Sequence, residues 1–127
     1  MSARRVDISS ASAYEEAVGY SRAARVGPHI VVAGTTGEGA DIASQTRDAL
    51  RRIEIALHEA GATLTDVVRT RIYVTDISMW REVGAVHHEV FGEVRPVATM
   101  VEVSALVAPQ LLVEVEADAY VTGAPGN

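Results

Sequence analysis

The stretch DVVRTRIYVTD, residues 66–76, decides the fold. Its apolar and polar side chains alternate, and a period of two is typical of a strand with one covered face. The side chains expected on the covered face are Val68, Thr70, Ile72 and Val74, and those expected on the opposite face are Arg69, Arg71 and Tyr73. The stretch therefore predicts a strand that packs on one side only.

A helix is predicted before this strand and another after it. The first begins after Asp41, which can act as its N-cap, and ends at Gly61. Its apolar stripe has spacings of four, three and four, at Thr46, Leu50, Ile53 and Leu57. The second lies within residues 77–93 and is expected to turn Trp80, Val83, Val86 or His87, and Val90 toward the sheet.

Further strands are predicted on both sides of these helices. Residues 21–36 contain two short strands around a VGPH turn, and residues 111–121 alternate like residues 66–76. Residues 97–103 are predicted as a strand with Val97, Thr99, Val101 and Val103 on one face and Ala98, Met100 and Glu102 on the other. The order strand, strand, helix, strand, helix, strand, strand predicts a two-layer α/β sandwich with a mixed sheet.

The sheet face away from the helices is expected to be mixed in character. It would carry Arg69, Arg71, Tyr73, Met100, Glu102, Leu112, Glu114, Glu116 and Asp118. Other subunits could cover this face and pair its charges, since buried charges need partners. A solvated outer face accounts for the charges equally well. The sequence leaves both alternatives open.

Composition limits the class of protein. The 127 residues fit a single domain, predicted over residues 1–121, with a small polar tail at 122–127 that is expected to fray. The net charge of −6 argues against nucleic acid as a partner, because phosphate binding needs a basic face. There is no cysteine, no secretion signal is visible and no apolar run approaches the length of a membrane span. His87 and His88 diverge on a helix, so no metal site is predicted. A cytoplasmic protein is the default expectation.

Several segments together resemble the RidA/YjgF (L-PSP) family. GYSRA, residues 19–23, resembles the family's GPYSQA, and IVVAGTT, residues 30–36, resembles its strand ending in SGQ. Residues 41–80 resemble its long helix, its DVV turn and its YVTD strand, and residues 95–120 resemble its two closing strands. The resemblance extends from about Tyr14 to Tyr120. It implies a chorismate-mutase-like α+β fold, with a mixed six-stranded sheet and two helices on one face.

The resemblance also implies an assembly and an activity. The family forms homotrimers with a central barrel, and small molecules bind in clefts between subunits. Its best-known activity is the hydrolysis of reactive enamines and imines to keto acids and ammonia, without a cofactor. Some members have been described as ribonucleases or translation inhibitors.

The resemblance matches individual residues of this sequence to the positions of the family's site. Tyr20 matches its N-terminal tyrosine, Gly34 matches the glycine of its second strand, and Glu114 matches the glutamate that orients the attacking water. Ala98 stands where active members hold a carboxylate-binding arginine, and Met100 stands where they often hold cysteine. The resemblance thus implies Glu114 as the catalytic residue, with Tyr20, Gly34, Ala98 and Met100 lining the substrate.

The absence of arginine at position 98 limits the substrates that are expected. Loss of a buried two-point carboxylate clamp typically costs a few kcal/mol, or about two decades of transition-state binding. Efficient turnover of a standard 2-imino acid is therefore not expected, while a neutral imine or enamine, including a bulky one, stays open. Arg95 could replace the missing charge, although strict alternation places it opposite Ala98. The alternatives are a non-catalytic ligand-binding trimer and, more weakly, a ribonuclease.

Overall fold

β4 (Val67–Val74) lies next to the centre of a six-stranded sheet in the computed structural model, which describes residues 4–122. The other strands are β1 (Arg5–Ile8), β2 (Ala23–Val26), β3 (His29–Thr35), β5 (Val97–Glu102) and β6 (Val113–Tyr120). Their order across the sheet is β1-β2-β3-β6-β4-β5. Only β4 and β5 pair in parallel, so the sheet is mixed, as predicted.

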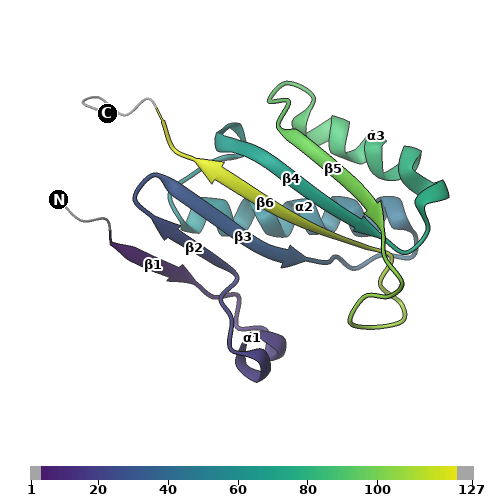
Figure 1. The fold of residues 1–127 in the computed structure, drawn as a ribbon, viewed down its shortest axis with the longest axis horizontal. Coiled ribbons are helices and arrows are strands. Elements are labelled where there is room, and N and C mark those ends of the chain that lie inside the picture. Colours follow the sequence, from purple (N-terminus) through teal and green to yellow (C-terminus); the bar gives the residue numbers. More distant parts are fainter. Residues whose placement is uncertain (1–3, 123–127) are drawn as a thin grey trace.

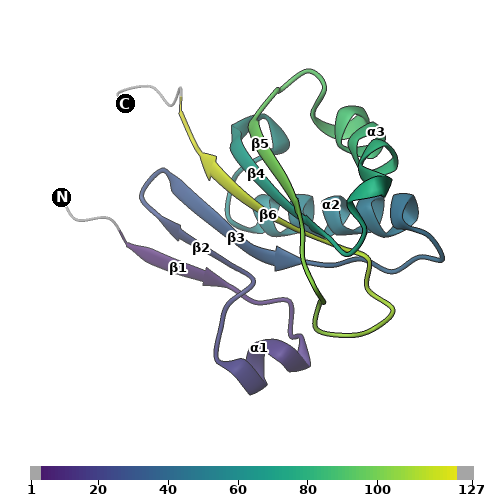
Figure 2. The same ribbon diagram turned by 45° about the vertical axis from the view of Figure 1, so that its right-hand side comes forward.

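Two long helices cover one face of this sheet (Figures 1 and 2). They are α2 (Ile42–Glu59) and α3 (Trp80–Phe91). Asp41 caps α2 by accepting the backbone N–H of Ser44, and Gly61 follows its end with a left-handed φ of 85°. Single-turn helices precede β4 (Leu64–Asp66) and α3 (Ile77–Met79). The predicted α+β sandwich is therefore confirmed.

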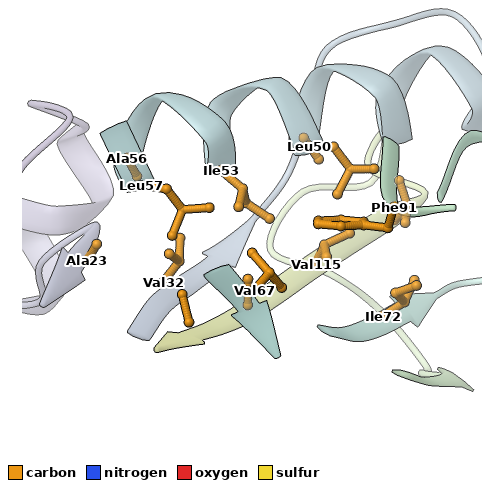
Figure 3. Close-up of a cluster of buried hydrophobic side chains, with 14 of the residues drawn as sticks. Ala23, Val32, Leu50, Ile53, Ala56, Leu57, Val67, Ile72, Phe91 and Val115 are labelled. Atoms are coloured by element: carbon orange, nitrogen blue, oxygen red, sulfur yellow. The ribbon is translucent and has the colours of Figure 1, made fainter. Parts of the chain in front are cut away.

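The core fills the space between α2, α3 and the sheet. The predicted stripe of α2, formed by Thr46, Leu50, Ile53 and Leu57, is wholly buried. In Figure 3 Leu50, Ile53 and Leu57 of this stripe meet Val32 of β3 and Val115 of β6, with Phe91 of α3 at the far end. The apolar side chains of each alternating strand point toward the helices, because water is excluded only on the side of the sheet that the helices cover.

Two expectations about packing were wrong. A register shift between Val67 and Arg69 turns Val67 into the core and leaves Val68 half exposed, so strict alternation fails at the start of β4. Trp80 is also exposed, with Arg81 stacked on its ring at 4.5 Å. Phe91, at the other end of α3, is the aromatic residue that enters the core.

The two faces of β5 are the reverse of the expectation. β5 pairs in parallel with β4, which sets Ala98, Met100 and Glu102 beside the helix-facing Thr70, Ile72 and Val74. Met100 packs against the core, whereas Val97 and Val101 are exposed on the outer face. The valine pattern was misleading because β5 is an edge strand, and its register with β4 decides which side faces the helices.

Sequence patterns missed two elements near the N-terminus. β1 adds the outermost strand beside β2, and a short helix, α1 (Ala13–Val18), stands away from the sheet beyond the β1 end. Ser12 caps α1 and Gly19 ends it with a φ of 85°. The predicted tail at residues 122–127 lies, except for Thr122, outside the described residues.

The outer sheet face contains apolar and charged side chains together. Its exposed large apolar residues are Val26, Val31, Val97, Val101 and Tyr120. Within the protomer, Tyr73 donates to Glu116 at 2.6 Å and Arg71 lies 3.8 Å from Asp118. Part of the charge on this face is therefore already paired within one chain.

Candidate functional site

A cavity of about 650 Å³ lies where the α1 segment meets the end of β3 and the side of α2. Its polar lining comes from distant parts of the chain, including Tyr20, Arg22, Gly34 and Glu114. Its apolar lining includes Tyr14 and Val18 of α1, Ile55 of α2 and Val107 of the loop before β6. The structure thus brings together Tyr20, Gly34 and Glu114, three of the residues predicted for the site.

Glu114 lies directly against Gly34. A Cβ built on Gly34 would stand 2.5 Å from Oε2 of Glu114 and 3.0 Å from its Cδ. Real Cβ atoms do not approach other atoms so closely, so only glycine leaves room for this carboxylate. The close approach explains why glycine occupies position 34, and it defines where the carboxylate sits in the cavity wall.

The Glu114 carboxylate is available to a ligand. Among residues 4–122 no hydrogen bond or ion pair engages its oxygens at ordinary bonding distance. Burial raises the pKa of Glu114, the nearby charge of Glu116 raises it further, and Arg22 acts in the opposite direction. A half-buried carboxylate with a raised pKa and free acceptor sites can orient water and accept its proton.

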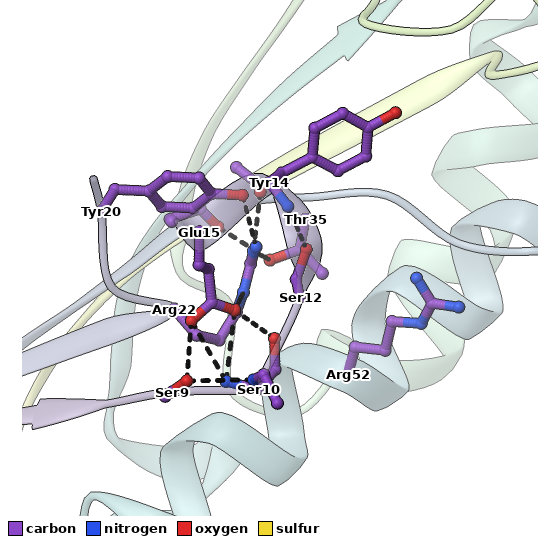
Figure 4. Close-up of polar contacts among 12 residues, drawn as sticks. Ser9, Ser10, Ser12, Tyr14, Glu15, Tyr20, Arg22, Thr35 and Arg52 are labelled. Atoms are coloured by element: carbon purple, nitrogen blue, oxygen red, sulfur yellow. Dashed lines mark hydrogen bonds and ion pairs between the residues drawn. The ribbon is translucent and has the colours of Figure 1, made fainter. Parts of the chain in front are cut away.

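Arg22 was not predicted for the site, and it is the most extensively bonded side chain there. Its Nη1 donates to the Gly34 carbonyl at 2.8 Å and to Oγ1 of Thr35 at 2.9 Å. Its Nη2 donates to the Tyr20 hydroxyl at 3.1 Å (Figure 4). The only available signal was the arginine in GYSRA, where the family segment GPYSQA has glutamine.

Glu15 has the opposite environment to that of Glu114. Its buried carboxylate accepts from both the hydroxyl and the backbone N–H of Ser10 and from the hydroxyl of Ser9 (Figure 4). Burial alone would raise its pKa, but these hydrogen bonds and the Arg22 charge lower it below the usual value. Glu15 is thus a saturated, ionised structural carboxylate, and it anchors α1 beside the cavity.

Ala98, Met100 and Arg95 do not line this cavity in one chain. Ala98 is exposed on the edge strand β5, and Met100 is partly buried against the core. Arg95 has a left-handed φ of 59°, and its Nε donates to the Gly92 carbonyl at 2.8 Å. It borders a separate hollow of about 360 Å³ beside His87, His88 and Pro96.

The described residues hold no group of three or more side chains suited to bind a metal ion. His87, the more buried of the adjacent histidines, bonds Thr70 through Nε2 at 2.9 Å. Burial lowers the pKa of His87. None of the described helices is both long and apolar enough to span a bilayer.

Comparison with known proteins agrees with this fold. The endoribonuclease L-PSP family model matches residues 10–121. A RutC family protein of Pyrococcus abyssi is 41% identical over 109 residues, covering 80% of this chain and 85% of that relative. A crystal structure of a YjgF/YER057c/UK114 family member from Mycobacterium tuberculosis superposes with a TM-score of 0.92 at 74% identity, covering 93% of this chain and 100% of that one. The chain therefore belongs to the L-PSP (YjgF) family.

One relative has a named activity. The 3-aminoacrylate deaminase RutC of Acinetobacter baylyi is 37% identical over 81 residues, which is 64% of each chain.

Proposed function

We propose that this protein is a trimeric hydrolase of a reactive enamine or imine other than the standard 2-imino acid. The observation that carries the proposal is the unpaired Glu114 carboxylate, which lies against Gly34 in a cavity shared with Tyr20. Membership in the family and the similarity to a 3-aminoacrylate deaminase support the reaction class.

The reaction follows from the position of Glu114. Its carboxylate orients a water molecule and accepts one proton as the water oxygen bonds to the imine carbon. That proton passes to the imine nitrogen to give a neutral carbinolamine. The carboxylate then moves the hydroxyl proton to the same nitrogen as the C–N bond breaks, the C=O bond forms and ammonia leaves. The sum is imine plus water to carbonyl compound plus ammonia, with no cofactor. An enamine enters the same route after it tautomerises to the imine.

The substrate class follows from position 98. Alanine supplies neither the charge nor the donors of a carboxylate clamp. The cavity volume of about 650 Å³ and its apolar lining suit a larger ligand without a carboxylate next to the reacting carbon. Arg95, turned toward Gly92, does not supply the missing clamp within the protomer.

The assembly is also part of the proposal. The outer sheet face exposes Val31, Val97, Val101 and Tyr120 together, and such a patch is typical of an interface. Packing three such faces in a barrel would bring the β5 edge of one subunit toward the cavity of the next. Ala98, which is exposed on that edge, would then border the cleft of a neighbouring chain, while Met100 stays against the core of its own subunit. Sedimentation at micromolar concentration should give the trimer mass.

The test is ammonia release from imines generated in solution, with neutral, bulky and 2-imino acid members in the panel. Wild type should accelerate hydrolysis of at least one neutral imine, and Glu114→Gln should lose that acceleration. Equal rates with and without protein across the panel would refute hydrolysis.

A second candidate function is a ligand-binding trimer without catalysis, which Ala98 favours. A compound that raises the melting temperature and is recovered unchanged would support it. RNA cleavage is the weakest candidate, because a net charge of −6 opposes phosphate binding.

A further inference from the structure

Arg22 bonds directly to Tyr20 and to Gly34, the residue against which the Glu114 carboxylate lies. It immediately precedes β2, and backbone hydrogen bonds to Ile8 and Ala33 hold it at 2.8 and 2.9 Å. Its side chain is only 12% exposed. The N–H donors of such a buried guanidinium need hydrogen-bond acceptors. The acceptors of Arg22 therefore show which groups this side chain holds in place.

One of those acceptors is the Tyr20 phenol oxygen. Nη2 of Arg22 donates to it at 3.1 Å, and the guanidinium carbon lies 5.5 Å from the centre of the Tyr20 ring. Arginine has no acceptor, so the hydroxyl must accept in this bond. The proton of the Tyr20 hydroxyl is then left for another partner, and none of the described residues accepts it. Tyr20 therefore presents a hydrogen-bond donor to the cavity.

A second contact connects Arg22 with Glu114 through Gly34. Nη1 of Arg22 holds the Gly34 carbonyl, while the Glu114 carboxylate lies against the Cα of the same residue. The Arg22 guanidinium thus fixes the Tyr20 hydroxyl directly and fixes the Glu114 carboxylate through Gly34. Figure 4 shows the bonds of Arg22 to Tyr20 and Thr35 meeting at this side chain.

The balance of charge disfavours a carboxylate ligand. The Arg22 charge is offset by Glu15, whose Oε2 lies 3.8 Å from Nε, and Glu114 adds a further negative charge. Arg51 and Arg52 also border the cavity, but Asp48 pairs with them at 2.7 and 3.1 Å. No cation of the described lining is left without an acidic partner, so a neutral acceptor is the better match for the Tyr20 donor.

We propose that Arg22 is a positioning residue that makes Tyr20 a hydrogen-bond donor, so that the cleft selects ligands with a neutral carbonyl-type oxygen near the reacting carbon. This preference for a neutral carbonyl oxygen specifies the substrate class of the proposed function. It rests on the proposed function only in assuming that the ligand binds in this cavity. A role limited to neutralising Glu15 would not explain the bond to Tyr20. Ser9 and Ser10 already hold Glu15, and its distance to Nε is beyond hydrogen-bond range.

The test uses benzamide, which has a neutral carbonyl, and benzoate as its anionic counterpart. Binding is followed by the shift of the Gly34 amide signal in NMR spectra. Wild type should bind benzamide more tightly than benzoate. Tyr20→Phe should weaken benzamide binding about tenfold, as expected for one lost hydrogen bond to a ligand, and Arg22→Met should weaken it similarly.

The double variant separates positioning from independent effects. If Arg22 acts through Tyr20, Tyr20→Phe/Arg22→Met should bind benzamide no more weakly than Tyr20→Phe. The matched control is Arg25→Met. Arg25 lies in β2 and donates to the Gly27 and Ala60 carbonyls away from the cavity, so this change should leave benzamide binding unaltered. If Arg22→Met does not fold, Arg22→Lys keeps the charge beside Glu15 but cannot hold Tyr20, Gly34 and Thr35 together.

Additive losses in the double variant, tighter benzoate binding, equal effects of Arg22→Met and Arg25→Met, or no benzamide binding at millimolar concentration would each overturn the inference. Failure of the proposed function is a separate result, because it would remove ammonia release and leave this binding pattern intact.

Discussion

The carboxylate of Glu114 occupies the space where any residue other than glycine at position 34 would place its Cβ. The two residues come from β6 and β3, which pair antiparallel with a register shift between Val32 and Thr35. This irregularity lies at Gly34, so the strand pairing itself prepares the place for the carboxylate.

The first prediction concerns this contact. Gly34→Ala should displace the Glu114 carboxylate, because the new Cβ would lie 2.5 Å from Oε2. The carboxylate is the free end of a flexible side chain, so the fold should persist while hydrolysis falls at least about tenfold. Rates and circular dichroism of the purified variant measure the two effects.

Gly84→Ala is the matched control for that change. A Cβ at Gly84 meets only the Trp80 ring, at 4.0 Å. Gly84 lies inside α3, where alanine is favoured over glycine by about 0.5–1 kcal/mol. This variant should therefore melt at a higher temperature. Loss of activity in Gly84→Ala and retention in Gly34→Ala would contradict the role given to the contact.

The second prediction is that Glu114→Gln abolishes hydrolysis yet stabilises the fold at pH 7. Burial first, and then Glu116, raise the Glu114 pKa above the usual 4.5, so the folded protein holds this proton more tightly than the unfolded chain does. Ionisation of Glu114 therefore opposes folding as the pH rises through this range, and glutamine removes the penalty.

The measurement is thermal unfolding of wild type and Glu114→Gln over a range of pH. The gain in Tm of the variant should be largest at neutral pH and should fade below about pH 4.5, where both unfolded and folded Glu114 bind the proton. A lower Tm at pH 7 would argue that Glu114 stabilises the fold rather than serving a ligand.

The third prediction tests position 98 by gain of function. Ala98→Arg would restore a planar donor fork on the exposed edge strand β5. If the new guanidinium enters the cavity of the adjacent subunit, kcat/KM for a 2-imino acid should rise about tenfold or more relative to kcat/KM for a neutral imine. Ala98→Lys is the control for charge without the fork, and it should give a smaller change.

The fourth prediction concerns acid stability. Hydrogen bonds from Ser10 and Ser9, with the Arg22 charge, outweigh burial and keep the Glu15 pKa below the usual 4.5. Its contribution to stability is present above that value and is lost as the pH falls through the lower folded pKa. Glu15→Gln should lower Tm at pH 7 and lessen the decline of Tm with acid. Glu16→Gln, an exposed change on the same helix, controls for the loss of one negative charge.

Sequence patterns predicted α2 and its buried stripe, because a helix of 18 residues repeats its period often enough to mark one face. They also predicted that Tyr20, Gly34 and Glu114 belong together, through the resemblance to a family. They failed for β5, a strand of six residues at a sheet edge, where side-chain alternation does not say which face the helices cover.

The sequence by itself therefore determined the elements with strong periodicity, the α+β class and the absence of the usual arginine at position 98. Only the tertiary structure decided which side chains line the cavity and which groups hold them. Arg22 and Thr35 are 13 positions apart and become partners through the β2–β3 pairing, whereas Arg95 is turned away by its backbone. Local patterns report the exposure of a segment, while the contacts of a guanidinium depend on strands that meet only after folding.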